Sequence, residues 1–173
     1  SDAITDATIL QARLMQERGD APPVGTFFVE AHKQRMWYGR TAANPTRVWY
    51  SDVGLPEDVY SGNNYIEFSD GEVSGDQVTG LTGNFEGRLV VWTESAVWTV
   101  SGTGAILGNI VDWNRLRSRV QVGCPTARSV AHIAAGARYI DAEGNPATTA
   151  TPMLAFFSSL GDIRLFDGRD DIR

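Results

Sequence analysis

The residues best suited to chemistry in this sequence are six carboxylates in its central part. They are Glu67, Asp70, Glu72, Asp76, Glu86 and Glu94. A glycosidase needs two carboxyl groups close together, one of them with a pKa raised by burial. Most of these acids lie beside Gly or Ser in segments typical of turns, so we expect solvated side chains rather than a paired acid and base. The sequence therefore favours a non-catalytic protein with no catalytic residue, and a fragment of a propeller glycosidase is the enzymatic alternative.

Two features could hold a metal ion. His32 and His132 are the two histidines of the chain, and no carboxylate or thiol cluster accompanies either one. The loop Ser69–Asp76 is rich in the oxygen ligands that calcium prefers, but its spacing does not fit an EF-hand and it lacks the closing Glu. The single cysteine, Cys124, excludes an intramolecular disulfide, and we expect a buried thiol at a turn. We therefore predict no metal and no cofactor.

Tryptophan side chains could stack on sugars or bases if they were exposed. The five tryptophans are Trp37, Trp49, Trp92, Trp98 and Trp113. Four of them fall in expected strands, where packing is the simpler use. We expect Trp37, Trp92 and Trp98 to pack in the core, and the role of Trp113 stays open.

The charge balance bears on possible partners. The formal net charge is -6, which argues against a simple nucleic-acid-binding surface, because such surfaces need clustered Lys and Arg. The closest basic cluster is Arg115–Arg119, whose alternation would place three arginines on one strand face. We interpret it as a solvated edge, with a local anion contact as the alternative. No Walker A, dinucleotide or Gly-x-Ser-x-Gly fingerprint, membrane span or signal peptide is visible.

Composition favours an all-β domain preceded by a short helix or lead-in. The chain has 173 residues, enough for one domain with a sizeable core, and its 42% hydrophobic and 21% charged content is typical of globular proteins. Eighteen glycines and little helical periodicity favour strands. The exception is the lead-in over residues 1–22, where Asp2 to Arg18 has apolar residues at helical spacing. Residues 23–173 then form the β domain.

This domain is organised around residues 76–104. They contain three short strands, Val78–Thr82, Arg88–Trp92 and Ala96–Ser101, separated by turn residues. Connections this short predict an up-and-down antiparallel meander. The middle strand is apolar on both faces, which predicts a strand buried between layers.

Two further segments repeat this pattern at an offset of roughly 50 residues, which is typical of propeller blades. The matching segments are Phe27–Tyr38 with Arg47–Asp52 upstream, and Ser129–Ile133, Met153–Phe157 and Asp162–Gly168 downstream, with an insertion around Ala142–Thr151. We therefore predict propeller-like antiparallel meanders in an incomplete or open propeller. Between these units we expect a hairpin turn at His32-Lys33, a strand Tyr65–Phe68, a loop or short strand over Gly104 to Asn114, and a strand Arg117–Val122.

Several short motifs occur in a fixed order along this domain. They are Ala31–Tyr38 with Val48–Pro56, then Asp76–Leu81 with Arg88–Trp92 and Ser95–Trp98, and then Gly123–Val130, Phe156–Ile163 and Phe166–Gly168. Over roughly Pro22 to Gly168, this order resembles that of structural proteins of tailed-bacteriophage tails and nozzles, which carry β-propeller-type repeats.

The resemblance implies a non-catalytic virion component that lines or supports the DNA channel of a phage tail, neck or nozzle and is assembled in the host cytoplasm. Its partners would be copies of itself in a ring and other tail or neck proteins. Genomic DNA would pass transiently and without specific binding, because an acidic inner surface repels phosphates. We expect no membrane and no small-molecule substrate.

The chain is shorter than a complete propeller, so a longer protein or neighbouring subunits would have to cover its open sheets. A carbohydrate-binding module with exposed aromatics is the second alternative.

Overall fold

The computed structural model describes residues 20–59, 63–69, 76–107, 110–119, 121–141, 143–168 and 171–172. These residues form antiparallel sheets, and they contain no α-helix. The all-β prediction is therefore confirmed. The helix expected over Asp2 to Arg18 falls on residues outside the described ranges.

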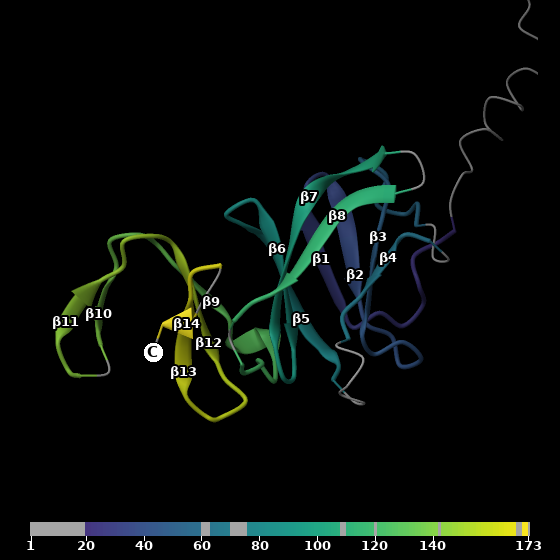
Figure 1. Ribbon diagram of the computed structural model, residues 1–173. Helices are drawn as coiled ribbons and strands as arrows, with labels where there is room; N and C mark the ends of the chain where they lie inside the picture. Colours follow the sequence, from purple (N-terminus) through teal and green to yellow (C-terminus); the bar gives the residue numbers. More distant parts are fainter. Residues whose placement is uncertain are drawn as a thin grey trace, which may run out of the picture.

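The first sheet has four strands that neighbour one another in sequence order (Figure 1). They are β1 (Phe28–His32), β2 (Arg35–Gly39), β3 (Arg47–Tyr50) and β4 (Tyr65–Glu67). The β1–β2 turn lies at Lys33-Gln34, one residue later than predicted, and both residues have positive φ angles, of 49° and 58°. Two-residue hairpin turns of this kind match the twist of the strands they join. The turn therefore places His32 directly opposite Arg35.

The central sheet is also a four-stranded meander, shown in teal and green in Figure 1. Its strands are β5 (Val78–Phe85), β6 (Arg88–Thr93), β7 (Val97–Leu107) and β8 (Ile110–Arg117). Of the two alternatives for Gly104 to Asn114, the strand is found, whereas the strand predicted over Arg117–Val122 is wrong, because the described residues after Arg117 are not strand. Gly102 and Gly104 lie at a bulge inside the long β7–β8 pair. Glycine is common both in bulges and in turns, so the sequence alone does not distinguish the two.

The third sheet has the strand order β14-β13-β12-β9. Its strands are β9 (Ala131–Ile133), β12 (Met153–Phe157), β13 (Ile163–Phe166) and β14 (Asp171–Ile172). The predicted insertion corresponds to a separate hairpin of β10 (Arg138–Ile140) and β11 (Pro146–Thr148), which projects from the end of the molecule (Figure 1). The short 3₁₀ helix η1 (Ala127–Ser129) occupies the start of the strand predicted at Ser129–Ile133.

The central sheet packs against one sheet on each of its faces. Strand β6 contributes Leu89 and Val91 to the core shared with the first sheet, and Val90 and Trp92 to the core shared with the third. All four side chains are fully buried. The prediction that this strand is buried on both faces is confirmed, and the three sheets lie face to face in a row.

The two outer sheets end this row differently. On the outer face of the first sheet, Tyr38 and Trp49 are buried with Val59, which belongs to the loop after β3. On the third sheet, Phe157 and Ile163 are exposed, by 46% and 74% of their surface, and they face each other across β12 and β13. The row is therefore covered at its first end and presents apolar side chains at the other.

Candidate functional site

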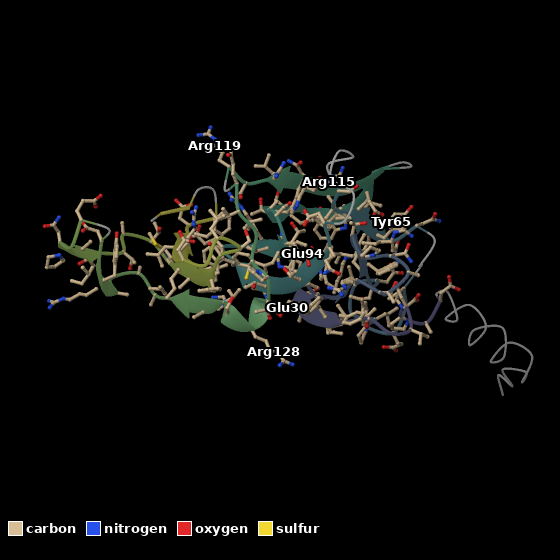
Figure 2. All side chains as sticks on the ribbon, turned by 90° about the horizontal axis from the view of Figure 1, so that it is seen from below. Glu30, Tyr65, Glu94, Arg115, Arg119 and Arg128 are labelled. Carbon is tan, nitrogen blue, oxygen red and sulfur yellow. The ribbon has the colours of Figure 1, made fainter. Side chains whose placement is uncertain are left out.

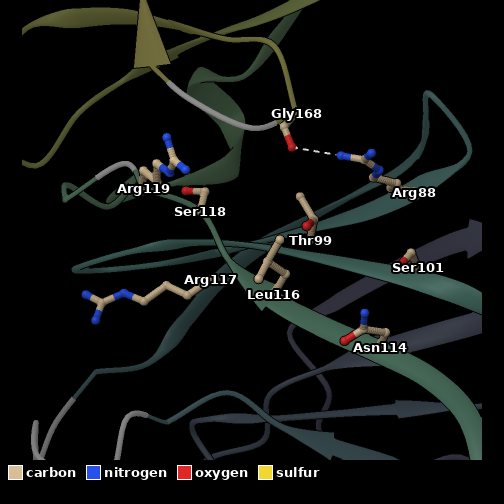
Figure 3. A pocket seen from close by; sticks show the side chains of 9 residues that line it. All are labelled: Arg88, Thr99, Ser101, Asn114, Leu116, Arg117, Ser118, Arg119 and Gly168. Carbon is tan, nitrogen blue, oxygen red and sulfur yellow. Dashed lines mark hydrogen bonds between the residues drawn. The ribbon is translucent and has the colours of Figure 1, made fainter.

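A groove of about 500 Å³ lies on the face of the central sheet that looks toward the third sheet. Its lining comes from β6, β7, β8, the segment after β8 and the segment after β13, and comprises Arg88, Thr99, Ser101, Asn114, Leu116, Arg117, Ser118, Arg119 and Gly168 (Figure 3). We call these nine residues the basic groove, because they include three arginines and no carboxylate.

The floor of the basic groove is made by two cross-strand pairs of β7 and β8. Thr99 lies opposite Leu116, and Ser101 lies opposite Asn114. Residues opposite each other in an antiparallel pair share a face of the sheet. The floor therefore presents two hydroxyl groups and one amide beside a leucine that is 63% exposed.

One wall of the basic groove is fixed by Arg88, the first residue of β6. Its guanidinium donates a hydrogen bond to the carbonyl oxygen of Gly168 at 3.0 Å, which ties the central sheet to the chain after β13 (Figure 3). The hydrogen bond fixes where this guanidinium lies relative to the floor.

The opposite side of the groove contains part of the arginine-rich segment, where Arg115 and Arg117 share one strand face, as predicted, opposite Val100 and Trp98. Arg115 packs over the ring of Trp98 at 5.8 Å, on the face toward the first sheet. Arg119 follows the end of β8, so the strand alternation no longer decides where it points. Of these three arginines, Arg117 and Arg119 border the basic groove, and Figure 3 shows their side chains extending away from each other.

Ser118 is the least expected part of this wall. Its side chain is 9% exposed, and its hydroxyl oxygen has no hydrogen-bond partner among the described residues. Its backbone N–H donates to the carbonyl oxygen of Val97 at 2.9 Å, which holds the residue in place. Figure 3 shows the hydroxyl beside the side chain of Arg119. Buried polar groups are nearly always paired in folded proteins, so an unpaired hydroxyl calls for an explanation.

The carboxylates do not form a paired acid and base in the described part of the chain. Glu67 accepts a hydrogen bond from Arg47 at 3.0 Å, and Glu94 accepts one from Gln77. Asp76 is buried, contrary to the expectation of a solvated side chain. Its carboxylate accepts a hydrogen bond from the hydroxyl of Thr93 at 2.9 Å and another from the backbone N–H of Ser95, in the turn between β6 and β7. These acids stabilise turns and strand ends. Glu86 lies exposed in the β5–β6 turn, and Asp70 and Glu72 lie outside the described residues.

One acid that the sequence did not single out has a shifted pKa. Burial raises the pKa of Asp58, and the neighbouring Asp52, Glu57 and Asp20 raise it further. No group of three or more His, Cys, Asp or Glu side chains in the described residues could hold a metal ion. Asp58 was missed because its surroundings come from a loop with no regular spacing.

His32 ends β1 and His132 lies in β9, and they contact the adjacent residues Asn84 and Phe85 of β5. His32 is 1% exposed, and its Nδ1 lies 3.1 Å from the side-chain oxygen of Asn84. Burial lowers the pKa of His32. The hydrogen bond with Asn84 raises this pKa, and the nearby charge of Lys33 lowers it by a smaller amount. His132 is exposed and its ring packs near Phe85.

The tryptophans and the cysteine mostly serve packing. Trp37, Trp49, Trp92 and Trp98 are buried, and half-buried Trp113 makes edge contacts with Trp37 and Tyr50. A buried ring cannot stack on a sugar, so these four buried tryptophans do not support the carbohydrate-binding alternative. Cys124 is fully buried, as predicted, and burial raises the pKa of its thiol.

The described part of the chain contains no helix with the length and hydrophobicity that a membrane span needs. Comparison with protein-family models and with curated proteins found no match to this chain.

Proposed function

We propose that this chain is a structural, non-catalytic component of a phage tail, neck or nozzle assembly that lines or supports the DNA channel. In this proposal the three meanders act as blades of a propeller-like arrangement. Four-stranded antiparallel sheets packed face to face are the building units of propellers, which supports the proposal. The order of the short motifs from Pro22 to Gly168 is its second support.

The observation that carries an assembly role is the exposed outer face of the third sheet. Phe157 and Ile163 are exposed there as a cross-strand pair, and Leu160 nearby is 70% exposed. Contiguous exposed apolar side chains mark surfaces that contact another protein. The inner face of the same sheet already packs on the central sheet through Leu154 and Phe156. In the proposed ring, the outer face contacts another copy of this chain.

The test is the mass of the native particle, measured by light scattering and native mass spectrometry on the full chain. We expect a closed ring of several copies, which a Phe157→Asp and Ile163→Asp double variant converts to monomers. The control is Val24→Asp, which adds one negative charge, against two in the double variant, at a residue that is 95% exposed and lies away from this face.

A wild-type chain that stays monomeric at high concentration and melts cooperatively would refute the ring. Loss of the ring in the Val24→Asp control as well would show that added charge, rather than this face, disrupts it.

A further inference from the structure

We propose that the β10–β11 hairpin is an arm that packs on the outer face of β1 in a neighbouring copy of this chain. The exposed face of the hairpin contacts apolar side chains of that strand, and Arg138 of the hairpin faces Glu57 in the acidic loop of the same sheet. This inference rests on the proposed ring and goes beyond it, because it names the two surfaces that meet.

The first observation is that the hairpin has no packing partner within the described part of its own chain. β10 and β11 pair only with each other, and none of their residues belongs to the three cores formed by the described residues. Figure 1 shows both strands projecting from the end of the molecule. An isolated two-stranded hairpin is at best marginally stable in water. The hairpin therefore gains stability from a partner outside the chain.

Hydrogen bonds nevertheless hold the hairpin in one shape at its base and at its tip. At the base, the backbone N–H of Ala137 donates to the hydroxyl of Thr149 at 3.0 Å, and Thr149 is buried. At the tip, the Asp141 carboxylate accepts from the backbone N–H groups of Glu143 and Asn145, at 3.1 and 2.7 Å. A preformed element loses little conformational freedom when it binds. These hydrogen bonds therefore favour an arm that is ready to contact a partner.

One face of the hairpin carries an apolar pair and a positive charge. Ile140 lies opposite Pro146, and Arg138 lies opposite Thr148. All four side chains are exposed, Ile140 by 66% of its surface. Alternate residues of a strand and residues opposite each other share a face. The hairpin joins β9 to β12, so it continues directly from the sheet whose outer face forms the proposed contact between copies.

A matching apolar surface lies at the other end of the row of sheets. The loop after β3 covers Tyr38 and Trp49 there, but Val29 of β1 is 53% exposed and Ala31 is also exposed. Val29 lies opposite Tyr38 and therefore shares the outer face of the first sheet. Val24, the control position for the ring, lies beside Trp49 and so outside this surface. Two different apolar ends on one chain give a head-to-tail contact, which closes into a ring when the rotation allows.

Charge complementarity directs the arginine of the hairpin to this same end. The loop after β3 carries Asp52, Glu57 and Asp58. Burial raises the pKa of Asp58, and the charges that raise it further, on Asp52, Glu57 and Asp20, are all negative. Asp52 already lies 3.7 Å from the guanidinium of Arg35, whereas Glu57 is exposed. An acidic surface of this kind favours a partner surface with a positive charge.

The test measures the assembly of the full chain by native mass spectrometry and sedimentation. Ile140→Asp and Arg138→Glu should each weaken assembly about tenfold. The melting temperature of the single chain should stay unchanged, because both side chains are exposed in it. Adding Glu57→Arg to Arg138→Glu should recover assembly, since the two charges are then exchanged across the contact. The matched control is Arg128→Glu, because Arg128 is an exposed arginine of η1 that lies between the two ends of the row (Figure 2).

The outcomes separate this inference from the ring itself. A wild-type chain that stays monomeric would refute both. A ring that forms equally well in Ile140→Asp and Arg138→Glu would overturn the hairpin contact and leave the ring in place. Equal losses in Arg138→Glu and Arg128→Glu, or no recovery on adding Glu57→Arg, would also overturn it, because the arginine of the hairpin would then not face the acidic loop.

Discussion

Trp92 tests whether the central and third sheets form one folded unit. Its side chain is fully buried between them, with ring centroids 5.0 Å from Phe156 and 6.1 Å from Phe166. Its indole N–H donates to the hydroxyl of Thr82 at 2.8 Å. Replacing Trp92 with alanine therefore removes both the packing between the sheets and one buried hydrogen bond.

The expected loss follows from these two contributions. Truncating a fully buried tryptophan to alanine costs about 3–5 kcal/mol in unfolding free energy. Leaving the buried Thr82 hydroxyl unpaired adds about 1–3 kcal/mol. Trp92→Phe keeps an aromatic ring and loses the hydrogen bond, so its cost should lie near the second contribution alone. Since domains are typically stable by about 5–15 kcal/mol, the alanine variant should be close to unfolding.

Urea denaturation followed by far-ultraviolet circular dichroism measures these losses. Trp37→Ala is the matched variant, because Trp37 is equally buried between the first and central sheets. If the three sheets unfold as one unit, both alanine variants shift a single transition. A loss below about 1 kcal/mol for Trp92→Ala would refute the packing described between the central and third sheets.

Two further predictions concern packing and pH. Gly80→Ala should lower the unfolding free energy by about 1–3 kcal/mol, because the added Cβ would lie 1.9 Å from the Cβ of Ala127. Adding Ala127→Gly to this variant should recover part of the lost melting temperature. An unchanged melting temperature in Gly80→Ala alone would contradict this contact. The pKa of His32 is lowered from 6.5 by burial, so the folded state binds fewer protons than the unfolded state and stability should fall as the pH drops below about 6.5. His32→Gln should flatten this pH dependence in melting experiments between neutral and mildly acidic pH, and an unchanged slope would show that other groups cause it.

The residue pattern alone determined the strand class and the buried central strand. Leu89, Val90, Val91 and Trp92 are apolar without alternation, and a strand of this kind is stable only with a layer on each face. The short turns around β6 also predicted the meander, because two-residue and three-residue connections can join only neighbouring antiparallel strands. These are local properties, so a single sequence reveals them.

Pairing of distant segments decided the rest. A loop or a short strand was expected from Gly104 onward, but β7 and β8 form a long pair there, because a bulge between Gly102 and Ile106 absorbs the irregular backbone. Tyrosine and tryptophan side chains on the first sheet are buried because the loop containing Val59 covers them, and no local pattern predicts that contact.

The basic groove likewise exists only in the tertiary structure. Arg88 and Gly168 are far apart in the sequence and meet through one hydrogen bond, while Arg119 leaves the strand alternation that predicted its direction. Spacing along one strand fixes which side chains share a face, but the lining of this groove combines three strands of the central sheet with Gly168, which follows β13. Only the packing of the third sheet on the central one brings Gly168 to Arg88.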